Sequence, residues 1–514
     1  MPAFCGYSTA VLYLLGGKED VASQLFRRKS LHSLLEEMRG EQRLRRILGP
    51  VALTSLGVGC IIGTGIFVLT GVAAHEKAGP ALTLSFVVAG AACVFAALCY
   101  AEFASMVPVA GSAYTYAYAT LGELMAWIIG WDLVLEYAVA SATVSHGWSA
   151  YFRDFIGLLG FHIPAEVSGA PFDYVPGAAP LHLTGAYLDL PAVVIAALIT
   201  VVLVIGIRES AGFNAGMVIV KVLVVLFVIV VGSRYVDASN WHPFAPYGYG
   251  GLFSSGDPKG VLAGAALVFF AYIGFDSVST HAEEARNPQR DVPIGILVSL
   301  VLCTVLYIAV AAVLTGMVRF DQIDIHAPVS NAFIQRGFNR AGLLISLGAL
   351  TGITSVLLVL MLSQPRVMLA MARDGLLPRE FFGAVHERFR TPWKSTILTG
   401  VFVGLAGGLV PLHILAELVN IGTLLAFVLV CSAVLVMRKL HPEAERPFRA
   451  PLFPAVPILG ILFCLTLMLA LGWQNWLRLA VWLLIGLCIY FGYGRKHSLL
   501  NEENRTRSTR PSLK

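Results

Sequence analysis

Four glycines interrupt the first membrane-length apolar stretch of the chain. Gly57, Gly59, Gly63 and Gly65 fall within residues 56–67, where a membrane-spanning helix would normally be continuous. In hydrocarbon every backbone N–H and C=O group needs a partner inside the protein, so irregular backbone persists there only where it is buried or lines a polar cavity. The spacing therefore predicts a break in the helix and, beside it, a cavity that binds a ligand.

A second interruption occurs in the sixth apolar stretch, where residues 268–277 read VFFAYIGFDS. Glycine and polar residues again lie inside an otherwise apolar helix. The two interruptions are five apolar stretches apart, so the helices that carry them cross a membrane in opposite directions. That arrangement is typical of transporters built from two inverted repeats of five helices, with the substrate site between the broken helices.

Two broken helices offer the groups that a zwitterionic amino acid requires. The N-terminus of a half-helix presents free N–H groups that suit a carboxylate, and the free carbonyls that end the preceding half suit an ammonium group. We expect the N–H groups of Thr64 and Gly65 to face the carboxylate, and nearby carbonyls, such as that of Ile61, to face the ammonium group. The predicted substrate-binding residues are Ile61, Ile62, Gly63, Thr64, Gly65, Phe270, Ala271, Tyr272, Ile273 and Gly274. The alternative is that the glycines of the first stretch serve only close helix packing.

Lys221 is the only basic residue well inside an apolar stretch. An unpaired lysine at the middle of a membrane costs about 3 kcal/mol, so such residues usually have a function. We predict that Lys221 pairs with the buried acid Glu136, and that the hydroxyl of Tyr307 bridges them as a proton relay. Alternatively, Lys221, about seven residues or ~10 Å from the cytoplasmic end, extends its ammonium group to that surface. Glu102 and Asp132, nearer the ends of their stretches, are interpreted as structural.

The elements that must position these residues are transmembrane helices. Hydrophobic residues make up 57% of the 514-residue chain and charged residues 13%, against about 25% charged in soluble domains, so one globular core cannot bury the apolar surface. Apolar runs of about 20 residues predict an all-α polytopic membrane protein with twelve transmembrane helices. These runs are residues 50–74, 81–104, 124–149, 191–207, 213–232, 260–281, 293–318, 341–364, 395–411, 415–437, 453–472 and 476–493.

Twelve spans place both termini on the same side of the membrane. Most of the 36 lysines and arginines lie in the tails and the even-numbered loops, and positively charged loops stay in the cytoplasm, so both termini are expected there. The expected parts are an N-terminal tail (1–48), a first inverted repeat (49–232), a second (233–437), two further helices (438–494) and a C-terminal tail (495–514). Apolar residues at helical spacing near residues 31–38 predict a helix on the inner leaflet; a solvated tail is the alternative.

Several classes of function find no support in the sequence. The eight cysteines and twelve histidines have no metal-ligand or disulfide spacing, so neither a metal site nor a cofactor is predicted. No G-x-S-x-G or comparable nucleophile motif occurs, so an enzyme is not predicted. The basic residues are spread over loops and form no nucleic-acid footprint. A channel or a non-transporting sensor remains open, because either can use a broken helix.

The motifs that contain these residues resemble those of the bacterial members of the cationic amino acid transporter family, in the amino acid, polyamine and organocation superfamily. The resemblance is carried by residues 57–67, 130–137, 269–276, 283–288 and 371–378, and extends from about residue 26 to residue 500. It implies the leucine-transporter-like fold, a 5 + 5 inverted repeat with broken helices 1 and 6. It also implies proton-coupled symport of L-amino acids across a bacterial plasma membrane. Lys221 matches the family's fifth-helix lysine, whose charge would replace the sodium ion that sodium-coupled relatives hold between helices 1 and 8.

Selectivity among amino acids is expected to come from the eighth apolar stretch. Ile353 and Thr354 are predicted to face the distal end of the substrate there, and Ile353 is bulky and apolar. A cationic side chain would need a free acid at that end, whereas Glu136 is assigned to Lys221. We therefore expect small or medium neutral L-amino acids, carried by alternating access. A transporter of arginine and lysine and an amino acid exchanger remain alternatives, and the oligomeric state stays open.

Overall fold

The computed structural model describes residues 25–29, 48–106, 112–173, 182–206, 211–252 and 258–500. The expected inner-leaflet helix near residues 31–38, most of the N-terminal tail and residues 501–514 lie outside the described residues. Most of the described chain is helical.

Helices lie over each of the apolar stretches found in the sequence. The main ones are α4 (Pro50–Ile61), α5 (Thr70–Val72), α6 (Leu82–Met106), α8 (Glu123–Leu158), α9 (Leu190–Ile205), α10 (Ala211–Gly232), α11 (Val261–Val268), α12 (Ser277–Thr280), α13 (Pro288–Met317), α15 (Asn339–Arg373), α17 (Trp393–Leu409), α18 (Leu412–Leu440), α19 (Ala455–Ala470) and α20 (Trp473–Ile489). Within the described residues, eight helical segments are long and apolar enough to cross a membrane, and α4, α9 and α19 are shorter apolar helices. The protein is a multi-pass membrane protein.

Short elements connect the long helices. They are the helices α7 (Ser112–Thr120), α14 (Pro328–Gln335), α16 (Arg379–Phe382) and α21 (Arg495–His497), and the strands β1 (Phe172–Asp173) and β2 (His182–Leu183). The two strands pair antiparallel over two residues each. The all-α prediction therefore holds except for this minimal ladder in the part of the chain that the structure describes.

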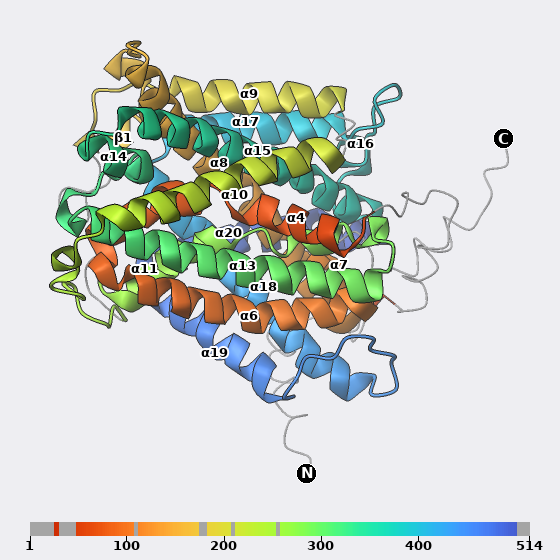
Figure 1. Cartoon of the computed structure of the whole chain (residues 1–514). Helices are drawn as coiled ribbons and strands as arrows, with labels where there is room; N and C mark the ends of the chain where they lie inside the picture. The colour runs from red at the N-terminus through yellow and green to blue at the C-terminus, as the bar shows by residue number, and fades with distance from the viewer. Residues whose placement is uncertain are drawn as a thin grey trace.

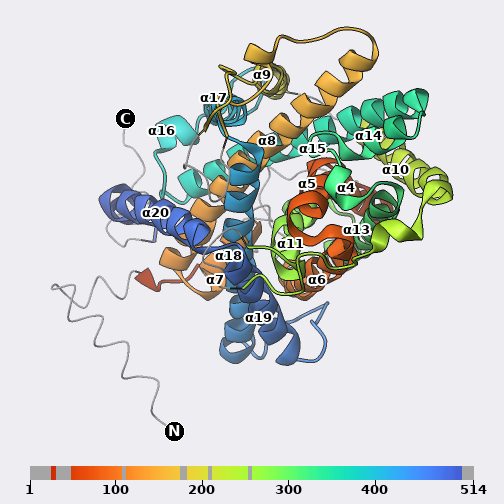
Figure 2. The same cartoon turned by 90° about the vertical axis from the view of Figure 1, so that its left-hand side faces the viewer.

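The long helices run side by side along one common direction (Figure 1). Helix α8 packs against α15 and α18, and α13 packs against α6 and α4. Seen along the helices, α4 and α5 lie inside the bundle, among α10, α13 and α15 (Figure 2). Helices α19 and α20 lie outside this arrangement, next to α18. The segment that contains the first predicted break is thus shielded by neighbouring helices.

The outward faces of the peripheral helices are apolar. Leu198 of α9, Leu223 of α10, Val305 of α13 and Leu484 of α20 each expose more than half of the side chain. A continuous apolar surface of this kind is unfavourable in water but matches the hydrocarbon of a bilayer. The lipid bilayer is therefore the partner of these faces.

Glu102 has the structural role expected of it. Its carboxylate accepts from the guanidinium of Arg438 on α18 at 2.9 Å and 2.5 Å and from the backbone N–H of Ala450 at 2.8 Å. A bidentate contact between a guanidinium group and a carboxylate is among the stronger ionic hydrogen bonds. It ties the end of α6 to the end of α18 and to the loop before α19.

Candidate functional site

The first transmembrane helix is interrupted where the glycines predict. Helix α4 ends at Ile61, Ile62 is extended (φ −75°, ψ 100°), and a π-helical segment begins at Gly65. The break exposes the last carbonyls of α4 and the first N–H groups of the next segment, because neither set has an intrahelical partner. The first predicted break is confirmed.

The second predicted break is confirmed as well. Helix α11 ends at Val268, a 3₁₀ turn covers Phe269–Tyr272, and α12 starts at Ser277. Between them Gly274 takes φ +114°, a conformation that residues with a side chain rarely adopt. A β-carbon there would also lie 2.9 Å from Cβ of Cys60 in the first break. The glycine therefore lets the two broken segments approach each other.

The two breaks also approach each other closely at Gly65. A β-carbon on Gly65 would lie 2.3 Å from Cα and 2.5 Å from Cβ of Ala271. Carbon atoms in contact are normally about 3.5–4.0 Å apart. Only glycine allows this packing of one broken segment against the backbone of the other.

Lys221 supports the first break from α10. Its buried ammonium group donates to the carbonyl oxygen of Gly59, to that of Ile62 at 3.1 Å and to the hydroxyl of Ser355 on α15 at 3.0 Å. These acceptors engage all three N–H donors. The expectation that the lysine places its charge between the first broken helix and the eighth apolar stretch is confirmed. The alternative that it extends to the cytoplasmic surface is wrong.

The predicted ion pair between Lys221 and Glu136 is wrong. Glu136 is buried on α8 beside two other acids, Asp276 and Asp132, and its Oε1 has no hydrogen-bond partner among the described residues. The reason is that the break itself supplies the acceptors: backbone carbonyls, which no side-chain pattern reveals, take the donors of the lysine. Glu136 and Lys221 are therefore separate polar groups.

Tyr307 joins the two breaks instead of linking Lys221 to Glu136. Its hydroxyl lies 2.8 Å from the carbonyl oxygen of Ile61 and 2.9 Å from that of Ala271. Both carbonyls thus converge on one atom of α13. Each carbonyl oxygen has two lone pairs, so each can accept a second donor while Tyr307 stays in place.

At the second break, Asn420 of α18 donates hydrogen bonds to backbone carbonyls, a role that was not predicted from the sequence. Its side-chain amide donates to the carbonyls of Ala266 at 2.8 Å and Leu267 at 3.0 Å, close to the end of α11 before the 3₁₀ turn. The sequence feature that could have revealed this role is an asparagine inside an otherwise apolar helix. Side chains of three unbroken helices therefore satisfy carbonyls at the two breaks.

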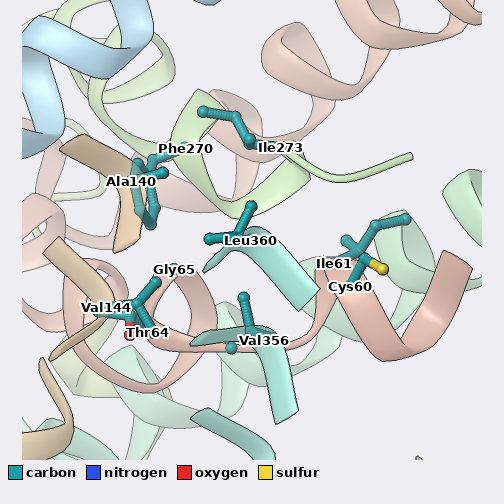
Figure 3. A pocket seen from close by; sticks show the side chains of 11 residues that line it. Cys60, Ile61, Thr64, Gly65, Ala140, Val144, Phe270, Ile273, Val356 and Leu360 are labelled. Carbon is teal, nitrogen blue, oxygen red and sulfur yellow. The ribbon is translucent and has the colours of Figure 1, made fainter. Parts of the chain in front are cut away.

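A small cavity lies between the two breaks (Figure 3). Its lining residues come from both broken segments, from α8 and from α15; they are Cys60, Ile61, Gly63, Thr64, Gly65, Ala140, Val144, Phe270, Ile273, Val356 and Leu360. The cavity volume is ≈ 10 Å³, about enough for one water molecule. An amino acid requires more room, so the site has to widen before it can admit one.

The structure brings most of the predicted residues together at this cavity. Ile61, Gly63, Thr64, Gly65, Phe270 and Ile273 line it. The others lie in its frame: the carbonyl of Ile62 accepts from Lys221, and the hydroxyl of Tyr272 donates to the carbonyl of Phe86 at 2.8 Å. Ala271 and Gly274 make the close contacts with the first break.

On α15 the cavity is lined one turn away from the residues predicted for it. Val356 and Leu360 reach the cavity, whereas Ile353 is buried beside them. The hydroxyl of Thr354 accepts from the indole N–H of Trp148 at 2.9 Å. Cys60 and, from α8, Ala140 and Val144 were also missed, because small apolar residues carry no sequence signal for a site.

Thr64 is the one polar side chain with a hydroxyl among the residues that line the cavity. Its hydroxyl oxygen is buried and has no hydrogen-bond partner in the part of the chain that the structure describes. Figure 3 shows it close to Gly65 and Val144 at the edge of the cavity. A buried hydroxyl without a partner is costly, so it is suited to bind a ligand.

A family model described as amino acid permease matches residues 48–492. The chain belongs to the amino acid permease family. The permease is 52% identical to the branched-chain amino acid permease BcaP of Bacillus subtilis (strain 168) over 479 residues, which cover 93% of this chain and 99% of that protein. It is 47% identical to the methylthioribose transporter of the same organism, over 93% of this chain and 100% of the relative.

More distant relatives agree with the resemblance seen in the motifs. The permease is 33% identical to the vacuolar cationic amino acid transporter 4 of Arabidopsis thaliana, over 93% of this chain and 97% of the relative. All of these relatives are permeases or transporters, so the prediction that the protein is not an enzyme is confirmed.

Proposed function

We propose that this permease carries neutral L-amino acids, branched-chain ones above all, across a bacterial plasma membrane together with a proton. The observation that carries the proposal is the cavity between the two breaks. It combines backbone polar groups at the broken helices with the apolar side chains of α8 and α15, and no charged residue is among those that line it. The branched-chain substrate named for the relative BcaP fits the same chemistry.

Each part of the substrate has a complementary group. The carboxylate binds the first N–H groups after the break and the hydroxyl of Thr64, and the ammonium group binds free lone pairs on the carbonyls of Ile61 and Ala271. The aliphatic side chain packs between α8 and α15, against residues such as Val144 and Leu360. An arginine or lysine side chain would bring an unpaired charge into this apolar end, which is unfavourable.

The proposed architecture has twelve transmembrane helices. Residues 49–232 and 233–437 form the two inverted repeats of five helices, residues 438–494 form two further helices, and the tails at 1–48 and 495–514 are cytoplasmic. The support is the position of the two breaks, five apolar stretches apart, and the excess of lysine and arginine in the even-numbered loops. Transport proceeds by alternating access, because the cavity is too small for the substrate in its present state.

In this proposal, two residues with different roles couple proton movement to transport. The charge of Lys221 holds the first break against α15, where the family resemblance implies that it replaces the sodium ion of sodium-coupled transporters. Glu136, a buried acid of α8 next to the second break, binds and releases the transported proton. During this proton binding and release, the hydroxyl of Tyr307 stays bonded to the carbonyls of the two breaks and keeps them close together.

Thermal unfolding of the purified permease with single amino acids tests the substrate class. Leucine, isoleucine and valine should each raise the unfolding temperature, because a ligand at 100 times its Kd stabilises the folded state by about 2.7 kcal/mol. D-Leucine serves as the control. A response confined to arginine and lysine contradicts the preference for neutral amino acids. A response to methylthioribose alone identifies methylthioribose as the substrate, the second candidate, because one relative is a methylthioribose transporter.

Replacing Thr64 separates substrate binding from folding. We expect Thr64→Val to weaken leucine binding about tenfold, because the substrate loses a hydrogen bond of roughly 1–1.5 kcal/mol, while the unfolding temperature stays the same or rises. Titration calorimetry and thermal unfolding measure the two effects. Thr64→Ser keeps the hydroxyl and should bind nearly normally; equal losses in both variants would mean that the hydroxyl does not touch the substrate.

A further inference from the structure

Buried polar side chains occur on α8 and α18, two helices that pack against each other. Asp132 and Glu136 are one turn apart on α8, and Asn420 and Thr423 are one turn apart on α18. All four side chains are at most 1% exposed. The helices pack directly here, since a β-carbon on Gly422 would lie 2.8 Å from Oδ1 of Asp132.

Five oxygen atoms of this group have no hydrogen-bond partner among the described residues. They are both carboxyl oxygens of Asp132, Oε1 of Glu136, Oδ1 of Asn420 and Oγ1 of Thr423. Each buried polar atom left without a partner costs about 1–3 kcal/mol, and the hydroxyl of Thr423 lies where it can relieve only Glu136, so the two oxygens of Asp132 still require a partner such as water. Buried water usually makes about three hydrogen bonds to groups of this kind and is the ligand that meets the deficit.

We propose that the polar contact between α8 and α18, the α8–α18 chamber, opens during transport to admit water and conducts the transported proton between Glu136 and the cytoplasmic side, with Asp132 as the intermediate carrier. The inference rests on the proton-coupled function proposed above and adds a residue and a route to it. Asp132, interpreted from the sequence as structural, thereby becomes part of the transport machinery.

The geometry of α8 fits this route. In the proposed topology α8 starts on the cytoplasmic side at Glu123, so Asp132 lies nine residues, or about 14 Å, along the helix and Glu136 about 6 Å further. The two carboxyl groups are neighbours on one face of the helix, and no direct hydrogen bond joins them in the part of the chain that the structure describes, so a water molecule can bridge them. Glu136 gives its proton to the bridging water, which passes one to the carboxylate of Asp132. Asp132 then releases a proton to water on the cytoplasmic side.

The other titratable groups around the chamber are engaged differently. Asp276, next to α12, accepts from the hydroxyl of Tyr137 at 3.0 Å and from the backbone N–H of Gly274 at 3.2 Å, so it belongs to the second break. Tyr100 of α6 contributes a buried hydroxyl without a partner among the described residues, near Asp276 and Glu136. On α18, Arg438 is bonded to Glu102. Asp132 is therefore the acid that remains available to water.

Uptake into proteoliposomes tests the route with Asp132→Asn. We expect leucine accumulation driven by an acidic exterior to fall at least roughly tenfold, because removing a positioned proton carrier slows transfer by about 10²–10⁴-fold. Leucine counterflow without a pH gradient should stay within about twofold of the parent, since it requires no net proton movement. Asp132→Glu should restore accumulation. The matched control is Asp154→Asn on the same helix, whose carboxylate accepts from Ser330 and Ser346; it should leave the ratio of accumulation to counterflow unchanged.

Infrared spectroscopy of the purified protein reads out the water directly. At a pH low enough to protonate Asp132, the expected result is a carboxyl C=O band that disappears in Asp132→Asn and shifts within minutes of transfer to D₂O. A band that D₂O leaves unchanged for hours, or full gradient-driven accumulation by Asp132→Asn, overturns the chamber while the proposed function stands. A parent protein that exchanges leucine but ignores the pH gradient overturns proton coupling and the route together. A parent that neither binds nor exchanges leucine overturns the proposed substrate.

Discussion

Lys221→Met should reduce pH-gradient-driven leucine uptake at least about 100-fold in proteoliposomes. The ammonium group of Lys221 donates to the carbonyls of Gly59 and Ile62, and hydrogen bonds to a charged group contribute about 1.5–3 kcal/mol each. Methionine has a similar length but no donor, so both carbonyls lose their partner inside the membrane. A loss of about 3 kcal/mol or more in the transport-competent arrangement corresponds to a factor above 100.

The control for this prediction is Ser355→Ala, which removes only the third acceptor of the ammonium group, at 3.0 Å. The two bonds to the first break remain, so we expect uptake to fall by only roughly tenfold, which corresponds to the loss of one hydrogen bond of about 1.5 kcal/mol to the charged group. Monodisperse elution of each variant in size-exclusion chromatography verifies folding. Undiminished uptake by Lys221→Met would remove Lys221 from the coupling mechanism.

The breaks in the two helices could be predicted from the sequence because their cause is local. A backbone that leaves the helical conformation needs residues that tolerate it, and glycines clustered inside an apolar stretch meet that need. Gly274 illustrates this, since its φ of +114° is one that a side chain would disfavour. The opposite direction of the two broken helices followed from their separation by an odd number of positions, from the first apolar stretch to the sixth.

The partners of the buried polar side chains could not be predicted in the same way. Lys221 and Tyr307 both bond to backbone carbonyls, and a carbonyl looks the same at every position of a sequence. The predicted lining on α15 missed the cavity by one turn along the same face, because the position of a helix along its axis relative to its neighbours depends on packing across the whole interface. Asp132 lies nearer the end of its stretch than Glu136, yet only the structure reveals that both of its carboxyl oxygens lack partners among the described residues.

A single methyl group at Gly65 should stop transport. In Gly65→Ala the new β-carbon would meet Cα of Ala271 at 2.3 Å and its backbone nitrogen at 2.9 Å. These are backbone atoms, so relief requires the broken segments to separate by more than about 1 Å to restore normal contact. That movement also pulls apart the carbonyls of Ile61 and Ala271, which both converge on the hydroxyl of Tyr307. We expect leucine binding to be lost and stability to fall by about 1–3 kcal/mol.

Two further glycines test whether this effect follows the geometry. A β-carbon on Gly63 would meet Cγ2 of Val356 at 2.8 Å, and a side chain can rotate away, so Gly63→Ala should give an intermediate loss. Gly216 of α10 has no atom within 4 Å of the added carbon, and Gly216→Ala should transport normally. Uptake should therefore be highest in Gly216→Ala, lower in Gly63→Ala and lowest in Gly65→Ala. Equal effects at all three positions would contradict the contact between the two breaks, because they would reflect only the intrinsic difference between glycine and alanine in backbone preference.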